Sequence, residues 1–478
     1  MISVHDGCPE DPFGELVGFR REFHGCLTAR ADALFELCDA LLCVDGPVTS
    51  LAELSLAGVH RRGHGALYDC LACGRIDLSR LRMSVAALAL PRGEDRGLRI
   101  AIDVTPWPRP DAETSPGRLH CHRYCRCGGK HQTVPGWPYS VAAVLGAGRT
   151  SWTAPLDIRR LGPGEDATEV TAAQIRELID RLERAGQLCP GDPPVLFVLD
   201  AGYDIVRLSW LLADLPVRLL GRIRANRVMH GPPSARRPGS RGRVSRHGPK
   251  FAFADPATHH ESDLHTSSGH ARYGTVRARA WGRLHPVLQG RGAWARHDGL
   301  LPIVEATIIH LDVDHLPGNR SPQPLWLWFS GSDIDTAELN LLWRSYLRRF
   351  DLEHTFRFLK QTLGFTRPRV RTPEQADRWA WLIITAYIQL RLGRGLVHDL
   401  RRPWEKPLDP DRITPGRCRR GFRHLRRKIG TPARVPKPSH PGPGRPTGSR
   451  SGPAPRHPIG KNPTKTDTPK RDRNKQTG

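Results

Sequence analysis

Apolar residues recur at helical spacing through roughly the first ninety residues of the chain. Residues 16–42 are rich in leucine, alanine, phenylalanine and arginine in this pattern, and a turn at residues 46–50 precedes another apolar stretch at residues 51–56. Ser50 can begin a helix there, because a serine side chain accepts a hydrogen bond from a free backbone N–H of the first turn. The pattern predicts a helical N-terminal region over residues 1–95.

Basic residues gather just before one apolar segment of this region. They are His60, Arg61, Arg62 and His64. A helix-turn-helix-like contact with DNA is one interpretation, which would make residues 1–95 a DNA-binding region. A helical cap on a neighbouring catalytic domain is equally consistent with the pattern, and both interpretations stay open.

Largely apolar short runs begin after residue 97 and predict buried strands. One covers residues 98–103 and ends in Asp103, and another covers residues 194–200 and ends in Asp200. Such runs are typical of strands that are covered on both faces. Further strands are expected at residues 140–147, 151–156 and 217–224, with helices at residues 171–185 and 205–212. Strands that alternate with helices predict an α/β domain.

The chain between residues 226 and 321 is rich in Arg, Gly, His and Pro. Strand-like pieces at residues 250–253, 275–281 and 303–313 predict a mostly β insertion. A strand is expected again at residues 325–329. It leads into a helix that continues through residue 360, and a further amphipathic helix is predicted at residues 373–392.

Four polar residues share one face of the helix expected before residue 361. They are Tyr346, Arg349, Glu353 and Lys360. At about 100° per residue they fall within a stripe roughly 60° wide. Leucine and phenylalanine side chains surround the stripe, so the helix is predicted to pack into a core while presenting a phenol, a carboxylate and two cations. The alternative is an amphipathic helix with a solvated charged edge.

The charge balance favours a polyanionic partner. The 478 residues include 73 Lys and Arg against 48 Asp and Glu, a formal net charge of +25, and nucleic acid is the leading candidate. Residues 401–478 hold 22 Lys and Arg against 5 Asp and Glu, so most of the excess lies in this tail. Within it, Phe422 and Leu425 can anchor a short helix. Residues 431–478 contain eleven prolines and few large apolar groups, which predicts disorder.

The sequence indicates no membrane partner. The N-terminus lacks a charged segment followed by an apolar one, and the longest apolar stretch, residues 379–390, is too short to span a bilayer. Eleven cysteines without an export signal favour reduced thiols over a disulfide framework. We expect a cytoplasmic, nucleoid-associated protein.

The spacing of the four polar residues is specific. Two residues separate Tyr346 from Arg349, three separate Arg349 from Glu353, and six separate Glu353 from Lys360. This resembles the Tyr-Arg-Glu-Lys signature of bacterial insertion-sequence transposases of the DDE type, in the insertion-sequence-four group. The segment Asp-Ala-Gly-Tyr at residues 200–203 also looks like the motif around the second acidic residue of this group.

The resemblance implies an α/β fold with a ribonuclease H-like catalytic core, interrupted by a β-rich insertion. The core would comprise residues 96–225 and 322–400, and the insertion residues 226–321. A helical N-terminal region at residues 1–95 and a disordered, basic, Pro-rich tail at residues 401–478 complete the expected organisation. In relatives of this group, a similar insertion lies between the second Asp and the Glu.

By this resemblance, Asp103, Asp200 and Glu353 are the catalytic residues and the ligands of two Mg²⁺ or Mn²⁺ ions. Two such ions clamp the attacking and leaving oxygens of a phosphodiester, and hard cations prefer carboxylate oxygens. Asp103 has a structural alternative, in which it caps the turn that includes Pro106. Asp204 is expected to cap the helix that follows it.

The resemblance also assigns DNA contacts. Tyr346 and Arg349 would bind transposon-end phosphates, and Lys360 a phosphate on the other strand. The implied activity is cut-and-paste transposition: cleavage at terminal inverted repeats and strand transfer into target DNA, by a homodimer in the synaptic complex. A DNA endonuclease without joining activity and a domesticated, non-catalytic DNA-binding regulator are the alternatives.

Two weaker patterns remain. The Cys and His residues at 120–131 have the residue types of a zinc site, but their spacing fits an ordinary loop with unrelated thiols better. The Pro-Gly-Arg-Pro segment at residues 443–446 resembles a minor-groove hook, but a single short match is weak evidence, and we favour non-specific attraction to phosphates.

Overall fold

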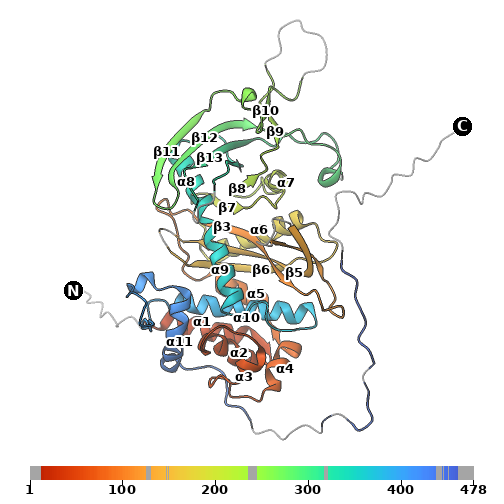
Figure 1. Cartoon of the computed structure of the whole chain (residues 1–478), viewed down its shortest axis with the longest axis vertical. Coiled ribbons are helices and arrows are strands. Elements are labelled where there is room, and N and C mark those ends of the chain that lie inside the picture. Colours follow the sequence, from red (N-terminus) through yellow and green to blue (C-terminus); the bar gives the residue numbers. More distant parts are fainter. Residues whose placement is uncertain are drawn as a thin grey trace, which may run out of the picture.

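The computed structural model describes residues 12–124, 131–146, 148, 150–234, 245–295, 297–316, 321–437, 444, 446–450 and 452–460. Helices gather at one end of the molecule, and a large sheet fills the middle and the other end (Figure 1). Among the described residues, no helix combines the length and apolarity that crossing a bilayer requires.

The N-terminal region is helical. Its helices are α1 (Gly14–Cys26), α2 (Ala31–Cys43), α3 (Leu51–Ser55), α4 (Gly65–Cys73) and α5 (Leu78–Ala86), and the short strands β1 (Leu27–Ala29) and β2 (Arg75–Ile76) pair between them. The helical pattern at residues 16–42 is interrupted at Arg30, whose left-handed backbone (φ 54°) separates α1 and β1 from α2. Ser50 accepts a hydrogen bond from the backbone N–H of Glu53 (3.1 Å), which confirms it as the start of α3.

Five strands and two helices form the α/β unit that carries the predicted carboxylates. The strands are β3 (Arg99–Pro108), β5 (His131–Leu145), β6 (Thr153–Arg160), β7 (Val195–Leu199) and β8 (Val217–Ile223), with helices α6 (Ala167–Arg184) and α7 (Ile205–Leu211). β3, β5 and β6 are antiparallel, whereas β3, β7 and β8 are parallel. All five residues of β7 are buried, which is why its sequence is wholly apolar.

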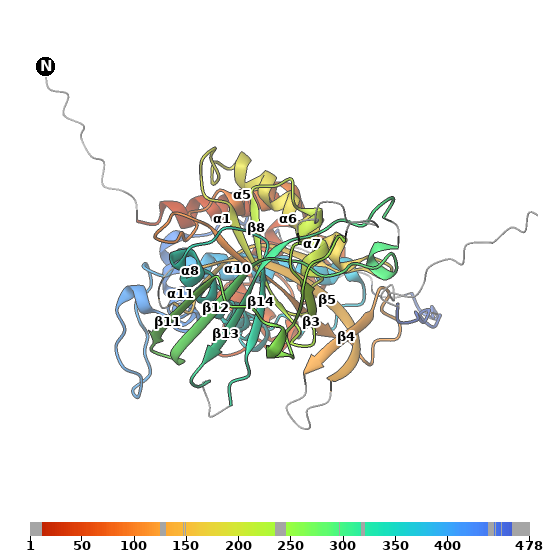
Figure 2. The same ribbon diagram turned by 90° about the horizontal axis from the view of Figure 1, so that it is seen from above.

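The β-rich stretch after β8 continues the central sheet. Its strands are β9 (Val228–His230), β10 (Lys250–Ala252), β11 (Leu264–His270), β12 (Gly274–Leu284), β13 (Ala306–Val313) and β14 (Leu325–Phe329), with the short turns η1 (Pro256–Thr258) and η2 (Gly292–Trp294). β14 pairs with β8, and the ten-stranded sheet has the order β11-β12-β13-β14-β8-β7-β3-β5-β4, with β6 on β5. Figure 2 shows this progression from β11 to the edge strand β4 (Leu119–Tyr124). β9 and β10 form a separate pair.

The chain after the sheet is helical again. It forms α8 (Thr336–Arg348), α9 (Phe350–Gln361), α10 (Pro373–Leu392), η3 (Pro410–Arg412) and α11 (Pro415–Ile429). The sequence predicts one continuous helix through residues 345–360. This is wrong, because Arg349 separates two helices: it ends α8 and precedes α9. Its backbone stays in the α region (φ −52°, ψ −30°), so the two helices follow one another closely. The bounds predicted for α10 are confirmed.

α10 joins the helical end to the sheet. Most of its side chains are buried, and it packs against α2 on one side and β6 on the other (Figure 1). α11 packs against α2 and α10. Phe422 and Leu425 are buried, so the prediction that they anchor a short helix is confirmed.

The tail beyond α11 contacts the rest of the protein at two places. Near its start, the carbonyl oxygens of Ala433 and Arg434 accept hydrogen bonds from Arg61, which also pairs with the buried Glu36 (2.7 Å). Farther along, the backbone N–H of Gly460 donates to the carbonyl oxygen of Arg118 (2.8 Å), beside the edge strand β4. Disorder is predicted over residues 431–478; the structure describes residues 431–437, 444, 446–450 and 452–460 of this range, and the others fall outside the described part of the chain.

A buried ionic network holds four helices together. The guanidinium of Arg20 on α1 donates to both oxygens of Asp39 on α2 (2.7 and 3.1 Å) and to Gln389 Oε1 on α10 (2.5 Å). Arg426 on α11 donates to Asp39 as well (3.1 Å). The Asp39 side chain is 0% exposed, so the two arginines balance its charge in place of solvent.

We predict that Asp39→Ala lowers the free energy of unfolding by about 3–5 kcal/mol, because it leaves the buried guanidinium of Arg20 and the partly buried one of Arg426 without their carboxylate. Denaturant unfolding followed by circular dichroism measures the change. Asp45→Ala is the matched control, since Asp45 also pairs with an arginine of α11, Arg423 (2.8 Å), but is 78% exposed and should matter little. Equal effects of the two substitutions would contradict the prediction.

Candidate active site

Asp103 and Asp200 lie side by side because their strands are parallel neighbours. Ala101 of β3 pairs with Val198 of β7, and each aspartate follows two residues later. Asp200 comes directly after the last residue of β7, as predicted. Asp103 does not end its strand, since β3 continues to Pro108 as the long antiparallel partner of β5.

Glu353 reaches the two aspartates from the first turn of α9. Arg349, at the junction of α8 and α9, connects all three carboxylates. Its Nη1 donates to Asp103 Oδ2 (3.2 Å), its Nη2 donates to Glu353 Oε1 (3.2 Å), and Nη2 lies 3.6 Å from Asp200 Oδ2. The structure therefore brings together three acidic residues that the sequence separates by up to 250 positions.

Burial differs sharply among these four groups. The side chain of Arg349 is 4% exposed, whereas those of Asp103, Asp200 and Glu353 are 22%, 39% and 48% exposed. Burial alone would lower the pKa of Arg349, but the surrounding carboxylates, Asp200 first, raise it above its ordinary value. The cation is thus enclosed by protein, while the carboxylates open toward solvent.

Tyr346 is buried beside this cluster, in the last turn of α8. Its ring centre lies 6.0 Å from the guanidinium carbon of Arg349. Burial, together with the charge of Asp200, raises the pKa of Tyr346. The phenol is therefore neutral and available as a hydrogen-bond donor at physiological pH.

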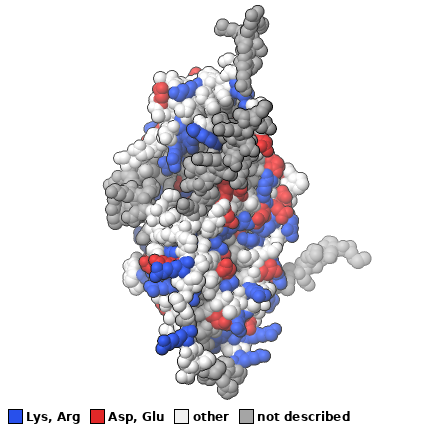
Figure 3. Space-filling model, turned by 90° about the vertical axis from the view of Figure 1, so that its right-hand side faces the viewer, with Lys and Arg blue, Asp and Glu red and all other residues white. Residues whose placement is uncertain are grey.

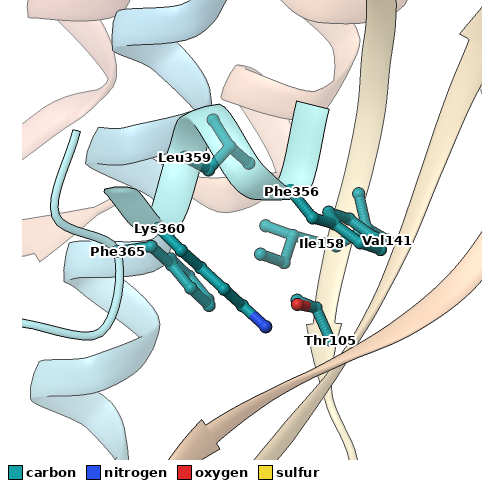
Figure 4. A pocket seen from close by; sticks show the side chains of 7 residues that line it. All are labelled: Thr105, Val141, Ile158, Phe356, Leu359, Lys360 and Phe365. Carbon is teal, nitrogen blue, oxygen red and sulfur yellow. The ribbon is translucent and has the colours of Figure 1, made fainter. Parts of the chain in front are cut away.

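Lys360 lies two turns beyond Glu353, in a small pocket between α9 and the sheet. The lining of this narrow pocket is Thr105, Val141, Ile158, Phe356, Leu359, Lys360 and Phe365. Figure 4 shows the Lys360 amine directed toward Thr105, which lies two residues beyond Asp103 on β3. Burial lowers the pKa of Lys360 to about 8, although the charge of Asp103 opposes this shift.

Two residues of the site carried no assigned role in the sequence. Burial, with the nearby Asp103 carboxylate, raises the pKa of Tyr203, which places this phenol against the same cluster. Arg222 of β8 is exposed and acts electrostatically on Tyr346. Arg218 and Arg222 are the two charged residues in the otherwise non-polar sequence of β8, and this is the sequence signal that could have identified Arg222 as a surface cation.

Two further aspartates near the site, Asp204 and Asp351, have partners outside the cluster around Arg349. Asp204 accepts a hydrogen bond from the backbone N–H of Arg207 (3.2 Å) and begins α7, which confirms its role as a helix cap. Asp351 pairs with Arg348 (3.0 Å) rather than with the guanidinium of Arg349.

The donor set fits a hard divalent cation. All three acidic side chains offer carboxylate oxygens, and Asp200 Oδ1 is buried without a hydrogen-bond partner, so it keeps a free acceptor. Within the described residues, no three His, Cys, Asp or Glu side chains already form a metal-binding cluster. Arg349 instead occupies the space between the carboxylates.

The predicted Cys and His cluster is only partly described. Cys125 and Cys127 lie outside the described residues, whereas Cys121 is buried in β4. Each cysteine in the described part of the chain is a free thiol.

The carboxyl of Asp103 should make stability depend on pH. Burial raises its pKa from 3.8 to about 6, although Arg349 opposes the shift. The folded protein holds this proton more tightly than the unfolded chain does. The protonated carboxyl therefore adds to the free energy of unfolding below pH 4, and this contribution is lost as the pH rises to 6. We predict that the wild type loses about 2–3 kcal/mol relative to Asp103→Asn across this window. Thermal unfolding in EDTA measures it, and a constant difference between the two proteins would contradict it.

Comparison with known proteins adds the family. Residues 22–287, more than half of the chain, match the family described as DDE superfamily endonuclease. The matched segment includes Asp103 and Asp200, and it ends before Glu353. No curated protein matches the chain. The match covers most of the N-terminal helical region and the parallel strands that hold the two aspartates. Because it spans more than half of the chain, the chain belongs to the DDE superfamily endonucleases.

Proposed function

We propose that this protein is a DDE transposase of the insertion-sequence-four group, which cleaves DNA at transposon ends and transfers the freed strand into target DNA. One observation carries the proposal: Asp103, Asp200 and Glu353 come from three distant elements and meet around one guanidinium. A family of endonucleases implies DNA as the substrate, and the signature residues supply the finer assignment.

The three carboxylates are the groups that would hold two Mg²⁺ or Mn²⁺ ions. When bound, such ions neutralise the scissile phosphate and activate the attacking oxygen. Asp103 and Asp200 provide a rigid edge because their strands are fixed by pairing, and Glu353 closes the site from a helix. A rigid donor set suits an in-line displacement, in which small errors of position are costly.

Cations around the carboxylates are suited to hold DNA phosphates. The Lys360 amine points toward Thr105, two residues beyond Asp103, and the exposed Arg222 acts electrostatically on Tyr346, as Asp200 does. The neutral phenol of Tyr346 can add a hydrogen bond to a phosphate oxygen. These positions support a substrate strand that crosses the acidic cluster between the two cations.

The strand arrangement supports the ribonuclease H-like assignment. Three antiparallel strands, β3, β5 and β6, precede the parallel strands β7 and β8, with the first strand in the centre. We place the catalytic core at residues 96–225 and 322–400, and the β-rich insertion at residues 226–321, where β11 to β13 extend the same sheet. The N-terminal region, residues 1–95, and the basic tail, residues 401–478, complete the proposed division.

The tail is the proposed site of non-specific attraction to DNA. It holds most of the positive excess, whereas Lys and Arg are interspersed with Asp and Glu over the described side chains of the face in Figure 3. Counterion release makes such attraction strongly dependent on salt. We further propose that the protein acts as a homodimer on paired transposon ends, at the nucleoid.

Glu353→Gln is the sharpest test of the proposed chemistry. We predict that it retains DNA binding and loses Mg²⁺-dependent cleavage by at least about a hundredfold, because even groups that only touch a metal's ligands contribute about 10- to 100-fold. Cleavage and joining of labelled DNA carrying the element's own inverted repeats provide the measurement. Cleavage without joined products would favour the endonuclease alternative, and binding without either reaction in the wild type would favour the regulator.

The control for this test is Asp351→Asn, which removes a neighbouring carboxylate that pairs with Arg348 instead. It should leave cleavage within about threefold of the wild type. Undiminished cleavage by Glu353→Gln would overturn the assignment of the active site.

We predict that DNA affinity falls as the pH rises above 8, by about tenfold, because Lys360 then loses its charge and one charged phosphate contact. Fluorescence anisotropy of duplex DNA in EDTA between pH 7 and 9 measures it. Lys360→Arg keeps the charge at every pH in this range. An unchanged pH dependence in that variant would show that another group is responsible.

A further inference from the structure

Arg349 is the shared counter-cation of the acidic cluster. One guanidinium faces three carboxylates, at 3.2 Å from Asp103, 3.2 Å from Glu353 and 3.6 Å from Asp200. Without it, three like charges would lie close together, and each would raise the energy of the others. The ion pairs thus account for how the metal-free protein keeps its carboxylates gathered.

The position of Arg349 in the chain suits a side chain that moves. Its backbone lies between two helices, where it ends α8 and precedes α9. Its Nε atom is buried without a hydrogen-bond partner in the described structure. The guanidinium also lies 5.2 Å from the ring centre of Phe350 and 6.0 Å from that of Tyr346, so aromatic faces adjoin it on one side. Among the described residues, the three carboxylates are the groups with which Arg349 forms ion pairs, and they are themselves partly exposed to solvent.

The sum of the charges at the site indicates how many metal ions can bind while the Arg349 guanidinium remains between the carboxylates. Three carboxylates and one guanidinium leave two negative charges unbalanced, which a single divalent cation would neutralise. Two divalent cations together with a scissile phosphate diester balance the three carboxylates only when the guanidinium is absent. Arg349 and a fully loaded metal site therefore compete for the same carboxylate oxygens.

We propose that Arg349 is an exchangeable counter-cation: it holds Asp103, Asp200 and Glu353 in place before metal binding, and it releases them as divalent ions load. This inference rests on the proposed function, because it takes the three carboxylates as metal ligands. A neighbouring phosphate of the same DNA strand, outside this charge balance, can then accept the released guanidinium, whose planar fork suits a phosphate. Arg349 would thus balance the carboxylates of the metal-free site and then bind the substrate.

A fixed role for Arg349 makes the opposite prediction. If the guanidinium stays in place and orders the carboxylates for metal, its removal must weaken metal binding. If it competes with metal, its removal must strengthen binding. The sign of the change in metal affinity therefore separates the two roles, independently of catalysis.

The test is a calorimetric titration of Mn²⁺ into the full-length, metal-free protein. We expect Arg349→Gln to bind Mn²⁺ about tenfold more tightly than the wild type, a typical size for coupling between two ligands of one protein. Arg348→Gln is the matched control, since Arg348 is the preceding residue and pairs with Asp351 only. It should bind Mn²⁺ as the wild type does.

A second variant covers the case in which Arg349→Gln fails to fold. Arg349→Lys keeps the charge but cannot donate to Asp103 and Glu353 at the same time, so it should bind Mn²⁺ more tightly than the wild type and less tightly than the Gln variant. The rise of the melting temperature with Mn²⁺ gives an independent measure of each affinity.

Weaker or unchanged Mn²⁺ affinity in both Arg349 variants would overturn the inference while leaving the proposed function intact. Absence of Mn²⁺ binding in the wild type and in every variant would instead remove the metal site, and with it the proposed function. Tighter binding in the Arg349 variants, with an unchanged Arg348 control, supports the exchange.

Discussion

The parallel pairing of β3 with β7 is the constraint on which the site depends. Ala101 lies opposite Val198, and this register carries Asp103 and Asp200 to the same level of the sheet. A shift by one residue would turn one aspartate to the other face, because side chains alternate along a strand. The register is fixed by burial, since all five residues of β7 and the Ile-Ala-Ile segment at residues 100–102 of β3 are buried. The apolar runs therefore do more than form a core, because they also set the separation of two carboxylates.

The third carboxylate depends on the extension of the sheet. The chain leaves β8, forms the β-rich strands, and returns through β14, which pairs with β8 itself. This return brings α8 and α9 across the sheet near the ends of β7 and β8. The interruption at Arg349 leaves the helical direction nearly unchanged, since its backbone stays in the α region. The long separation of Asp200 and Glu353 in sequence thus corresponds to a short one in space.

Local patterns predicted much of this arrangement. The strand before Asp200, the bounds of α10 and the cap formed by Asp204 follow from apolar runs and capping chemistry alone. β4 and β11 were not predicted, because both carry polar residues and lie at or near the edges of the sheet, where an apolar pattern is weak. The pairing of β14 with β8 and the enclosure of Arg349 arise from contacts between distant segments. No local pattern specifies which arginine of the helix is buried and which, like Arg348, pairs nearby.

The arginine–carboxylate clusters at Asp39 and at Arg349 differ in exposure, and this difference explains why they have different roles. Asp39 and Arg20 are 0% and 2% exposed, so an ion from solvent cannot reach their contact unless the helices around it open. At Arg349 the burial is reversed, because the cation is enclosed while Glu353 remains 48% exposed. An incoming cation can reach the oxygens of Glu353 and Asp200 from solvent. The cluster at Asp39 therefore stabilises the packing of the helices. The cluster at Arg349 instead has the geometry of a site in which a cation from solvent can replace the arginine.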